Sequence, residues 1–150
     1  MEKTVRTLFA LLMSSAIMAL AGCSLPRTSA DTDALAKLMR PVPGKAVIYV
    51  FRNQEVSAPW RIELTLDGTS MGSTGANTYY RWSVEPGQHI IASHSQNHEG
   101  LVLNTEPDKI YYVWQNVLMG YFGPRARLQE VDRSTAEIAL RSCHLLQNRT

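Results

Sequence analysis

The histidines of the segment HIIASHSQNHE have the residue type and spacing that could bind a metal ion. His89, His94 and His98 lie close together in the chain, and Glu99 follows directly. A separation of four residues, as between His94 and His98, brings two imidazoles together on a helix. The segment predicts a strand and a turn, however, and there a separation of four residues does not by itself bring the two rings together. Strand alternation also places His89 and His94 on opposite faces. We expect polar histidines near a hairpin tip, with surface zinc or copper binding at His94 and His98 as the alternative.

Other catalytic patterns are weak in this chain. The glycines of DGTSMGSTG could cradle a phosphate, but such loops need a helix directly after them, and a strand is predicted there. Ser93, His94 and Asp108 supply the residue types of a nucleophilic triad without any motif that brings them together. We therefore expect no enzyme and no cofactor. A small hydrolase or metal-binding protein that uses the region of His89, His94 and His98 is the alternative.

Residues 1–22 predict a secretory signal peptide. Lys3 and Arg6 form a positive head, and an uncharged, mainly apolar run from Leu8 to Ala21 follows. This run is 14 residues long, whereas a membrane-spanning helix needs roughly 20. A positive head, a short apolar core and small residues at its end are typical of an exported protein.

The residues Leu20, Ala21, Gly22 and Cys23 resemble the bacterial lipoprotein signal. Small side chains let a protease approach the bond before the cysteine, and only a thiol can form a thioether to diacylglycerol. The resemblance implies cleavage before Cys23 and acylation by chains such as palmitate, which together anchor a protein stably. Ser24 is not acidic, which by enterobacteria-like sorting implies the outer membrane. We expect a lipid-anchored envelope protein that faces the periplasm.

The stretch from residue 23 to 44 predicts a linker. It is polar and carries prolines at positions 26, 41 and 43. A flexible chain of this length spans about 25 Å on average. Within it, Asp33 is expected to cap a short helix from Ala34 to Met39.

Residues 45–148 predict a mainly β domain. AVIYVFRN (46–53) is rich in β-branched and aromatic residues, which indicates a strand buried on both faces. RIELTLDG (61–68) alternates between apolar and polar residues, as a half-buried strand does. Further strands are predicted at NTYYRWSV (77–84), QHIIASHS (88–95), GLVLNT (100–105) and IYYVWQNV (110–117). We expect an antiparallel β-sandwich or small barrel, with 77–84 and 88–95 forming a hairpin.

The end of the chain predicts a short helix. Ser134 and Glu137 fit a capping box that opens AEIALRSCHLL. Cys143 follows Ala136, Ala139 and other apolar residues at steps of three and four, which places it on the apolar face of that helix. We expect a buried and inert thiol.

The β region resembles a domain-of-unknown-function family of small bacterial lipoproteins. The motifs are IYVFR (48–52), LDG (66–68) with a later glycine, VEPGQHII (84–91) and YYVWQ (111–115). The resemblance implies an exported, lipid-anchored β domain and no established catalytic residues. The glycine skeleton is also similar to PEGA-type β domains. The turn glycines themselves indicate architecture, with Gly68 expected in a D-G turn and Gly72 at a bulge or tight bend.

Two features could serve binding. Gln115 shares a strand face with apolar residues, so its amide needs hydrogen-bond partners if buried, from a neighbouring segment or from a ligand. In NVLMGYFGPR (116–125), Met119, Tyr121 and Phe122 lie in a predicted loop that either contacts a protein partner or folds over the core as a lid. The exposure of Trp60 poses the same question.

The charge of the chain gives little support for nucleic-acid binding, because the formal net charge is +2 and the basic residues are scattered. We expect a non-enzymatic binding or structural module at the periplasmic face of the outer membrane. Its partners would be the membrane, through lipid on Cys23, and an envelope protein.

Overall fold

The structure is a computed structural model that describes residues 25–55 and 59–148. The predicted signal peptide, Cys23 and Ser24 lie outside the described residues. In the described part of the chain, the helices are all too short or too polar to cross a membrane.

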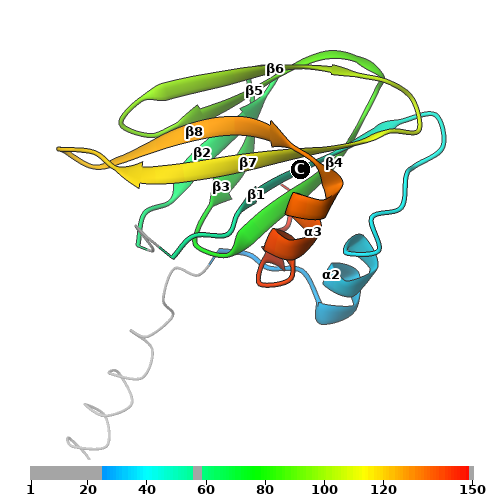
Figure 1. The fold of residues 1–150 in the computed structure, drawn as a ribbon, viewed down its shortest axis with the longest axis horizontal. Coiled ribbons are helices and arrows are strands. Elements are labelled where there is room, and N and C mark those ends of the chain that lie inside the picture. The colour runs from blue at the N-terminus through cyan, green and yellow to red at the C-terminus, as the bar shows by residue number, and fades with distance from the viewer. Residues whose placement is uncertain (1–24, 56–58, 149–150) are drawn as a thin grey trace, which may run out of the picture.

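The described residues form two stacked β-sheets and two short helices (Figure 1). One sheet has the strand order β8-β7-β1-β4-β9 and the other β3-β2-β5-β6. The strands are β1 (Ala46–Arg52), β2 (Ile62–Leu66), β3 (Thr69–Thr74), β4 (Thr78–Val84), β5 (Gly87–His94), β6 (His98–Thr105), β7 (Ile110–Met119), β8 (Pro124–Val131) and β9 (His144–Leu145). The predicted mainly β sandwich is confirmed, and the sheets do not close into a barrel.

The burial of β1 on both faces follows from its central position. All of its residues are buried, because the second sheet covers one face and the helices cover the other. β1 pairs with β4 in antiparallel orientation and with β7 in parallel orientation. The five-stranded sheet is therefore mixed, and the expectation of a purely antiparallel sandwich is wrong for this sheet.

Two apolar cores lie on the two faces of the five-stranded sheet. The core between the sheets contains Ile48, Val50, Leu64, Leu66, Tyr80, Trp82, Ile91, Leu103, Val113, Leu128 and Leu146. The core between this sheet and the helices contains Ala36, Met39, Val47, Tyr49, Phe51, Tyr79, Tyr112, Ala136, Ala139, Leu140, Cys143 and Leu145. The molecule thus has three layers, two of sheet and one of helix.

The predicted roles of two glycines are confirmed. Asp67 and Gly68 connect β2 to β3 with positive φ angles of 50° and 80°, as a two-residue hairpin turn requires. The β2–β3 register then shifts near Gly72, which has a φ of 124°. A Cβ at Gly72 would lie 2.2 Å from the hydroxyl oxygen of Tyr80. Only glycine fits this bulge, because the Tyr80 ring occupies the space of a side chain.

The predicted hairpin of residues 77–84 and 88–95 is wrong. β4 pairs with β1 and β9, whereas β5 pairs with β2 and β6. The connection at Glu85 and Pro86 therefore crosses from one sheet to the other. Period-two alternation identifies a half-buried strand but not its partner, and the buried faces of β4 and β5 pack across the sandwich instead.

Both helices begin earlier than the sequence predicts. α2 (Ala30–Ala36) is capped by the Ser29 hydroxyl, which accepts a hydrogen bond from the Thr32 backbone N–H, and Asp33 lies inside the helix. α3 (Arg133–Leu140) is capped by Asp132, which accepts from the Thr135 N–H, so the predicted Ser134 box does not form. In each case an oxygen-bearing residue lies upstream of the predicted cap and closes the first turn.

The C-terminal segment leaves the helix sooner than expected. α3 ends at Leu140, and residues 144–145 form β9 in parallel with β4. Cys143 therefore lies beyond the helix, between α3 and β9, but it is fully buried as predicted.

Candidate functional site

The connection between β7 and β8 exposes a cluster of large apolar side chains. Tyr121 is 94% exposed and Phe122 84%, while Leu118 and Met119 are more than half exposed. The two aromatic rings contact each other edge to face, with centroids 4.9 Å apart. This group, residues 118–122, is called the apolar tip below. The lid interpretation is wrong, because the tip covers no core.

The apolar tip is exposed because the two strands outrun the sandwich. Val117 and Ala126 form an inward-facing pair of the hairpin, and they pack on Ile62 of the opposite sheet. The next pair on this face is Met119 and Pro124, which lies at the level of the β5–β6 connection. The hairpin projects from the rest of the sheets at the left of Figure 1.

The neighbouring β5–β6 connection supports the base of the apolar tip. The Gln96 backbone N–H donates to the Pro124 carbonyl at 3.0 Å. The side-chain amide of Asn97 donates to the Ala126 carbonyl at 2.8 Å and accepts from the Ala126 N–H at 2.9 Å. These bonds hold the start of β8 to the second sheet, so the tip projects from a fixed base.

The charged side chains of the projecting hairpin are basic. Arg125 and Arg127 are exposed on β8, and residues 116–129 contain no Asp or Glu. The loop after β1 lies beside the same hairpin, since the Gln54 side chain bonds to the Asn116 side chain and the Val117 N–H. That loop leads to Trp60, which is 46% exposed.

Gln115 lies in a buried polar cluster between the sheets. Its amide nitrogen donates to the Ser93 hydroxyl at 2.7 Å, and its carbonyl accepts from the Thr74 hydroxyl. All three residues are fully buried. The sequence left open whether the Gln115 amide bonds to a neighbouring segment or to a ligand. The structure shows partners within the protein, the side chains of Thr74 on β3 and Ser93 on β5. The cluster ties β7 to the opposite sheet close to the apolar tip.

The structure separates the predicted histidine cluster into two parts. His89 Nδ1 lies 2.7 Å from the Asp67 carboxylate, away from the others. Burial alone would lower the pKa of His89, but the Glu85 carbonyl and the Asp67 carboxylate raise it. His94 and His98 are cross-strand partners whose Nδ1 atoms lie 3.1 Å apart. The expectation that these two rings do not converge is wrong, because they form the last pair before the β5–β6 turn.

A nucleophilic triad is not assembled. Ser93 points into the sandwich toward Gln115, whereas His94 lies on the outer face of the sheet, where its Nε2 contacts the Thr65 hydroxyl at 3.1 Å. Asp108 lies in the β6–β7 turn and accepts from the Gly44 N–H at 2.8 Å. Within the described residues there is also no group of three or more metal-binding side chains.

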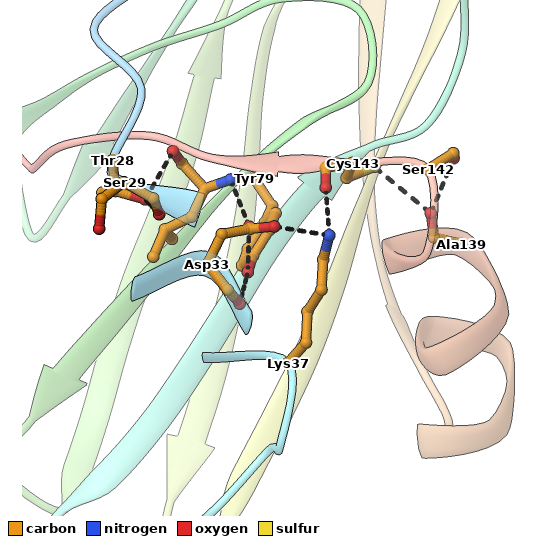
Figure 2. A network of polar contacts seen from close by, with 9 residues as sticks. Thr28, Ser29, Asp33, Lys37, Tyr79, Ala139, Ser142 and Cys143 are labelled. Atoms are coloured by element: carbon orange, nitrogen blue, oxygen red, sulfur yellow. Dashed lines mark hydrogen bonds and ion pairs between the residues drawn. The ribbon is translucent and has the colours of Figure 1, made fainter. Parts of the chain in front are cut away.

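The segment predicted as a flexible linker is docked on the domain from residue 25 onward. Asp33 of α2 accepts three hydrogen bonds: from the Lys37 ammonium at 2.8 Å, the Tyr79 hydroxyl at 2.9 Å and the Leu145 N–H at 2.8 Å (Figure 2). Lys37 also donates to the Cys143 carbonyl at 2.7 Å. The Asp33 network therefore joins α2 to β4 and β9, and the linker prediction is wrong for these residues.

The Asp33 network changes the acidity of its members. Burial alone would raise the pKa of Asp33, but the hydrogen bonds from Lys37, Tyr79 and Leu145 lower it below its usual value. Burial raises the pKa of the Cys143 thiol to about 11. At neutral pH, Asp33 is an anion and Cys143 a protonated thiol. The predicted burial of Cys143 is confirmed, and a protonated thiol is a poor nucleophile.

Sequence reasoning missed the role of Asp33. The separation of four residues between Asp33 and Lys37 was a signal for an ion pair, but the contact with β9 joins residues more than a hundred positions apart. Leu118 was also missed as part of the apolar tip, because the β7 strand continues past the predicted end at 117.

The chain was compared with protein-family models, with curated proteins and with solved structures, and no match was found in any of the three comparisons.

Proposed function

We propose that the protein is a non-enzymatic module, anchored by lipid on Cys23 at the periplasmic face of the outer membrane. It acts by contact, with the apolar tip as its contact surface for another envelope component. The observation that carries this proposal is the exposure of Tyr121 and Phe122 at 94% and 84% on a projecting hairpin. Large apolar side chains gathered at one exposed place mark an interaction site.

The proposed location rests on the sequence. The residues before Cys23 resemble a lipoprotein signal, and the β region resembles a family of small bacterial lipoproteins. The docking of α2 is compatible with this location, because it leaves only a short length of chain between Cys23 and the folded domain. Mass spectrometry of the protein from cells tests the anchor: we expect cleavage before Cys23 and acyl chains on that residue, both lost in Cys23→Ser.

The contact function is tested by photo-crosslinking in cells from position 121. The matched control is position 138, because Ile138 is an exposed apolar residue on α3, 68% exposed. We expect adducts with an envelope component from position 121 and not from position 138. Equal or absent crosslinking at the two positions would contradict the proposal.

The double variant Tyr121→Ala/Phe122→Ala provides a second test. Both side chains are exposed, so we expect the free energy of unfolding to change by less than about 0.5 kcal/mol each. If the double variant unfolds, the tip belongs to the core and the proposal is wrong. If it folds and the crosslinks from a neighbouring position, such as 118, disappear, the tip is the contact surface.

Metal binding is the second candidate function, favoured by the pair of His94 and His98. Two imidazoles bound to one zinc ion at about 2.0–2.1 Å have nitrogens about 3.3 Å apart in tetrahedral geometry. The observed separation of 3.1 Å is close to this value. Two ligands hold zinc weakly, so we expect the purified protein to retain no zinc or copper. A stoichiometric metal that is lost in His98→Ala, but not in His144→Ala, would favour the metal function instead.

A further inference from the structure

We infer that the apolar tip inserts into the interfacial region of a lipid bilayer with anionic headgroups, the same membrane that holds the lipid anchor. This inference rests on the proposed function and names the envelope component that the tip contacts. Three observations carry it: the chemistry of the tip, its size and shape, and its position relative to the start of the described chain.

The side chains of the tip match the layers of a membrane surface. Leu118, Met119 and Phe122 are apolar, and Tyr121 has an apolar ring with a polar hydroxyl end. Aromatic residues of this amphipathic kind are enriched where headgroups meet acyl chains. Arg125 and Arg127 are exposed just behind the tip, in a stretch without acidic residues. Basic side chains at this distance from an apolar tip would lie among anionic headgroups.

The size of the tip favours a bilayer over a protein partner. A stable protein interface takes about 800 Å² and some 20–30 residues from each partner. The apolar tip offers only four large side chains, on a hairpin that projects beyond the sheets (Figure 1). A narrow projecting hairpin presents its apolar side chains on more than one side. Fluid lipid can surround such a shape, whereas a protein would need a matching pocket.

The described chain begins at the same end of the sandwich as the apolar tip. Leu25 packs at Gly75, where an added Cβ would lie 2.8 Å from its side chain. Gly75 follows Thr74, which pairs with Ile62, and Ile62 packs on Val117 at the base of the tip. In Figure 1, the blue start of the described chain emerges beneath this part of the sheets, on the side of the molecule toward the tip.

This position makes the lipid anchor and the tip compatible with one membrane. Cys23 precedes Leu25 by two residues, which span at most about 7 Å of extended chain. Lipid on Cys23 would therefore hold this end of the domain at the bilayer. The tip then acts as a second attachment, which fixes the orientation of the domain on the membrane.

The experiment places an indole at the tip and measures its contact with lipid. The full-length lipidated protein is reconstituted into vesicles of phosphatidylglycerol and phosphatidylcholine, with bromine on the acyl chains of the phosphatidylcholine as a quencher. Phe122→Trp is compared with Ile138→Trp, which carries the new indole on α3, and with the unchanged protein, whose own tryptophans supply the background. Circular dichroism checks that each variant is folded.

We expect bromine to quench about half or more of the emission that Phe122→Trp adds, and to leave the emission from Ile138→Trp unchanged. Arg125→Glu combined with Arg127→Glu should reduce the quenching at position 122 in anionic vesicles, but not in vesicles of phosphatidylcholine alone. Equal quenching at positions 122 and 138, or none at 122, overturns the inference.

The outcomes separate this inference from the proposed function. If bromine does not quench at position 122, and crosslinks from position 121 in cells reach a protein, the tip binds a protein partner. The bilayer inference then fails, and the contact function stands. If neither crosslinks nor quenching appear at the tip, both fail. The anchor is measured separately, by the mass of the acyl chains on Cys23.

Discussion

Replacing Asp33 with alanine should loosen the attachment of α2 and β9 to the five-stranded sheet. The carboxylate accepts hydrogen bonds from Lys37, Tyr79 and the Leu145 N–H, all at 2.8–2.9 Å. Its side chain is only 16% exposed. The alanine variant removes all three bonds at once, without any change in the backbone path that the helix requires.

The three bonds do not contribute equally. The ion pair with Lys37 is partly exposed and spans one helical turn, so it contributes only about 0.3–0.5 kcal/mol, and Lys37 keeps the Cys143 carbonyl as a partner. The buried Leu145 N–H and Tyr79 hydroxyl lose a charged acceptor, at a cost of about 1–3 kcal/mol for each unsatisfied group. Tyr79 can turn to the Asp33 carbonyl, 3.4 Å away. We therefore expect a loss of about 2–4 kcal/mol in the free energy of unfolding.

Urea unfolding at neutral pH measures this loss, and amide hydrogen exchange shows whether it is concentrated in α2 and β9. Asp31→Ala is the matched control, since Asp31 lies exposed in the first turn of the same helix and should cost only about 0.5 kcal/mol through the helix dipole. If Asp33→Ala and Asp31→Ala have the same stability within error, the proposed role of the Asp33 network is wrong.

The same carboxylate predicts a dependence of stability on pH. The pKa of Asp33 is lower in the folded protein than the ordinary value of 3.8 for this carboxyl group. The unfolded chain therefore takes up the proton first as the pH falls, and the stabilisation by the anion is present above about pH 4 and lost as the pH falls through the folded pKa. Between pH 5 and pH 3, we expect the unchanged protein to lose more stability than Asp33→Ala. A parallel decline of both would contradict the assignment.

Three further predictions concern the core. Gly72→Ala should destabilise the protein by about 2 kcal/mol or more in urea unfolding, because the added Cβ meets the Tyr80 hydroxyl at a positive φ. An unchanged urea midpoint would show that the space beside Gly72 can hold a side chain. Gln115→Leu should cost about 1–3 kcal/mol, since it leaves the buried Ser93 hydroxyl unpaired. Adding Ser93→Ala to that variant should recover part of the loss, and a further loss would argue against the bond. Cys143 should resist iodoacetamide at pH 8 in the folded protein and react in urea, because burial raises its thiol pKa to about 11; alkylation of the folded protein at the rate of a free thiol would show that it is accessible.

Six of the nine described strands could be predicted from local patterns, whereas β3, β8 and β9 were missed and the pairing of the strands could not be predicted. The apolar run of β1 and the alternation of β2 identify strands, because side chains point to opposite faces at a period of two residues. Neither pattern says which strand lies beside which. The crossing from β4 to β5 between the sheets, read as a hairpin from the sequence, depends on which buried faces pack together.

The apolar tip could likewise be predicted only in part from the sequence. The sequence identifies Tyr121 and Phe122 as large apolar residues between glycines, which is a property of residue type. Whether they lie under or outside the core depends on how far the opposite sheet and its β5–β6 connection extend beside the hairpin, and these segments are distant in the chain. Exposure is a property of the whole packed structure, so the lid and the contact surface could not be distinguished locally.

The sequence by itself determined the mainly β class and the burial of Cys143, and it predicts the lipoprotein-like signal, because each depends on residues close together in the chain or on their average character. Only the tertiary structure decided that Asp33 binds the Leu145 N–H, that His94 faces His98 without His89, and that the apolar tip projects beyond the sheets. Each of these depends on contacts between distant strands, and those contacts form only when the two sheets and the helices pack around their shared cores.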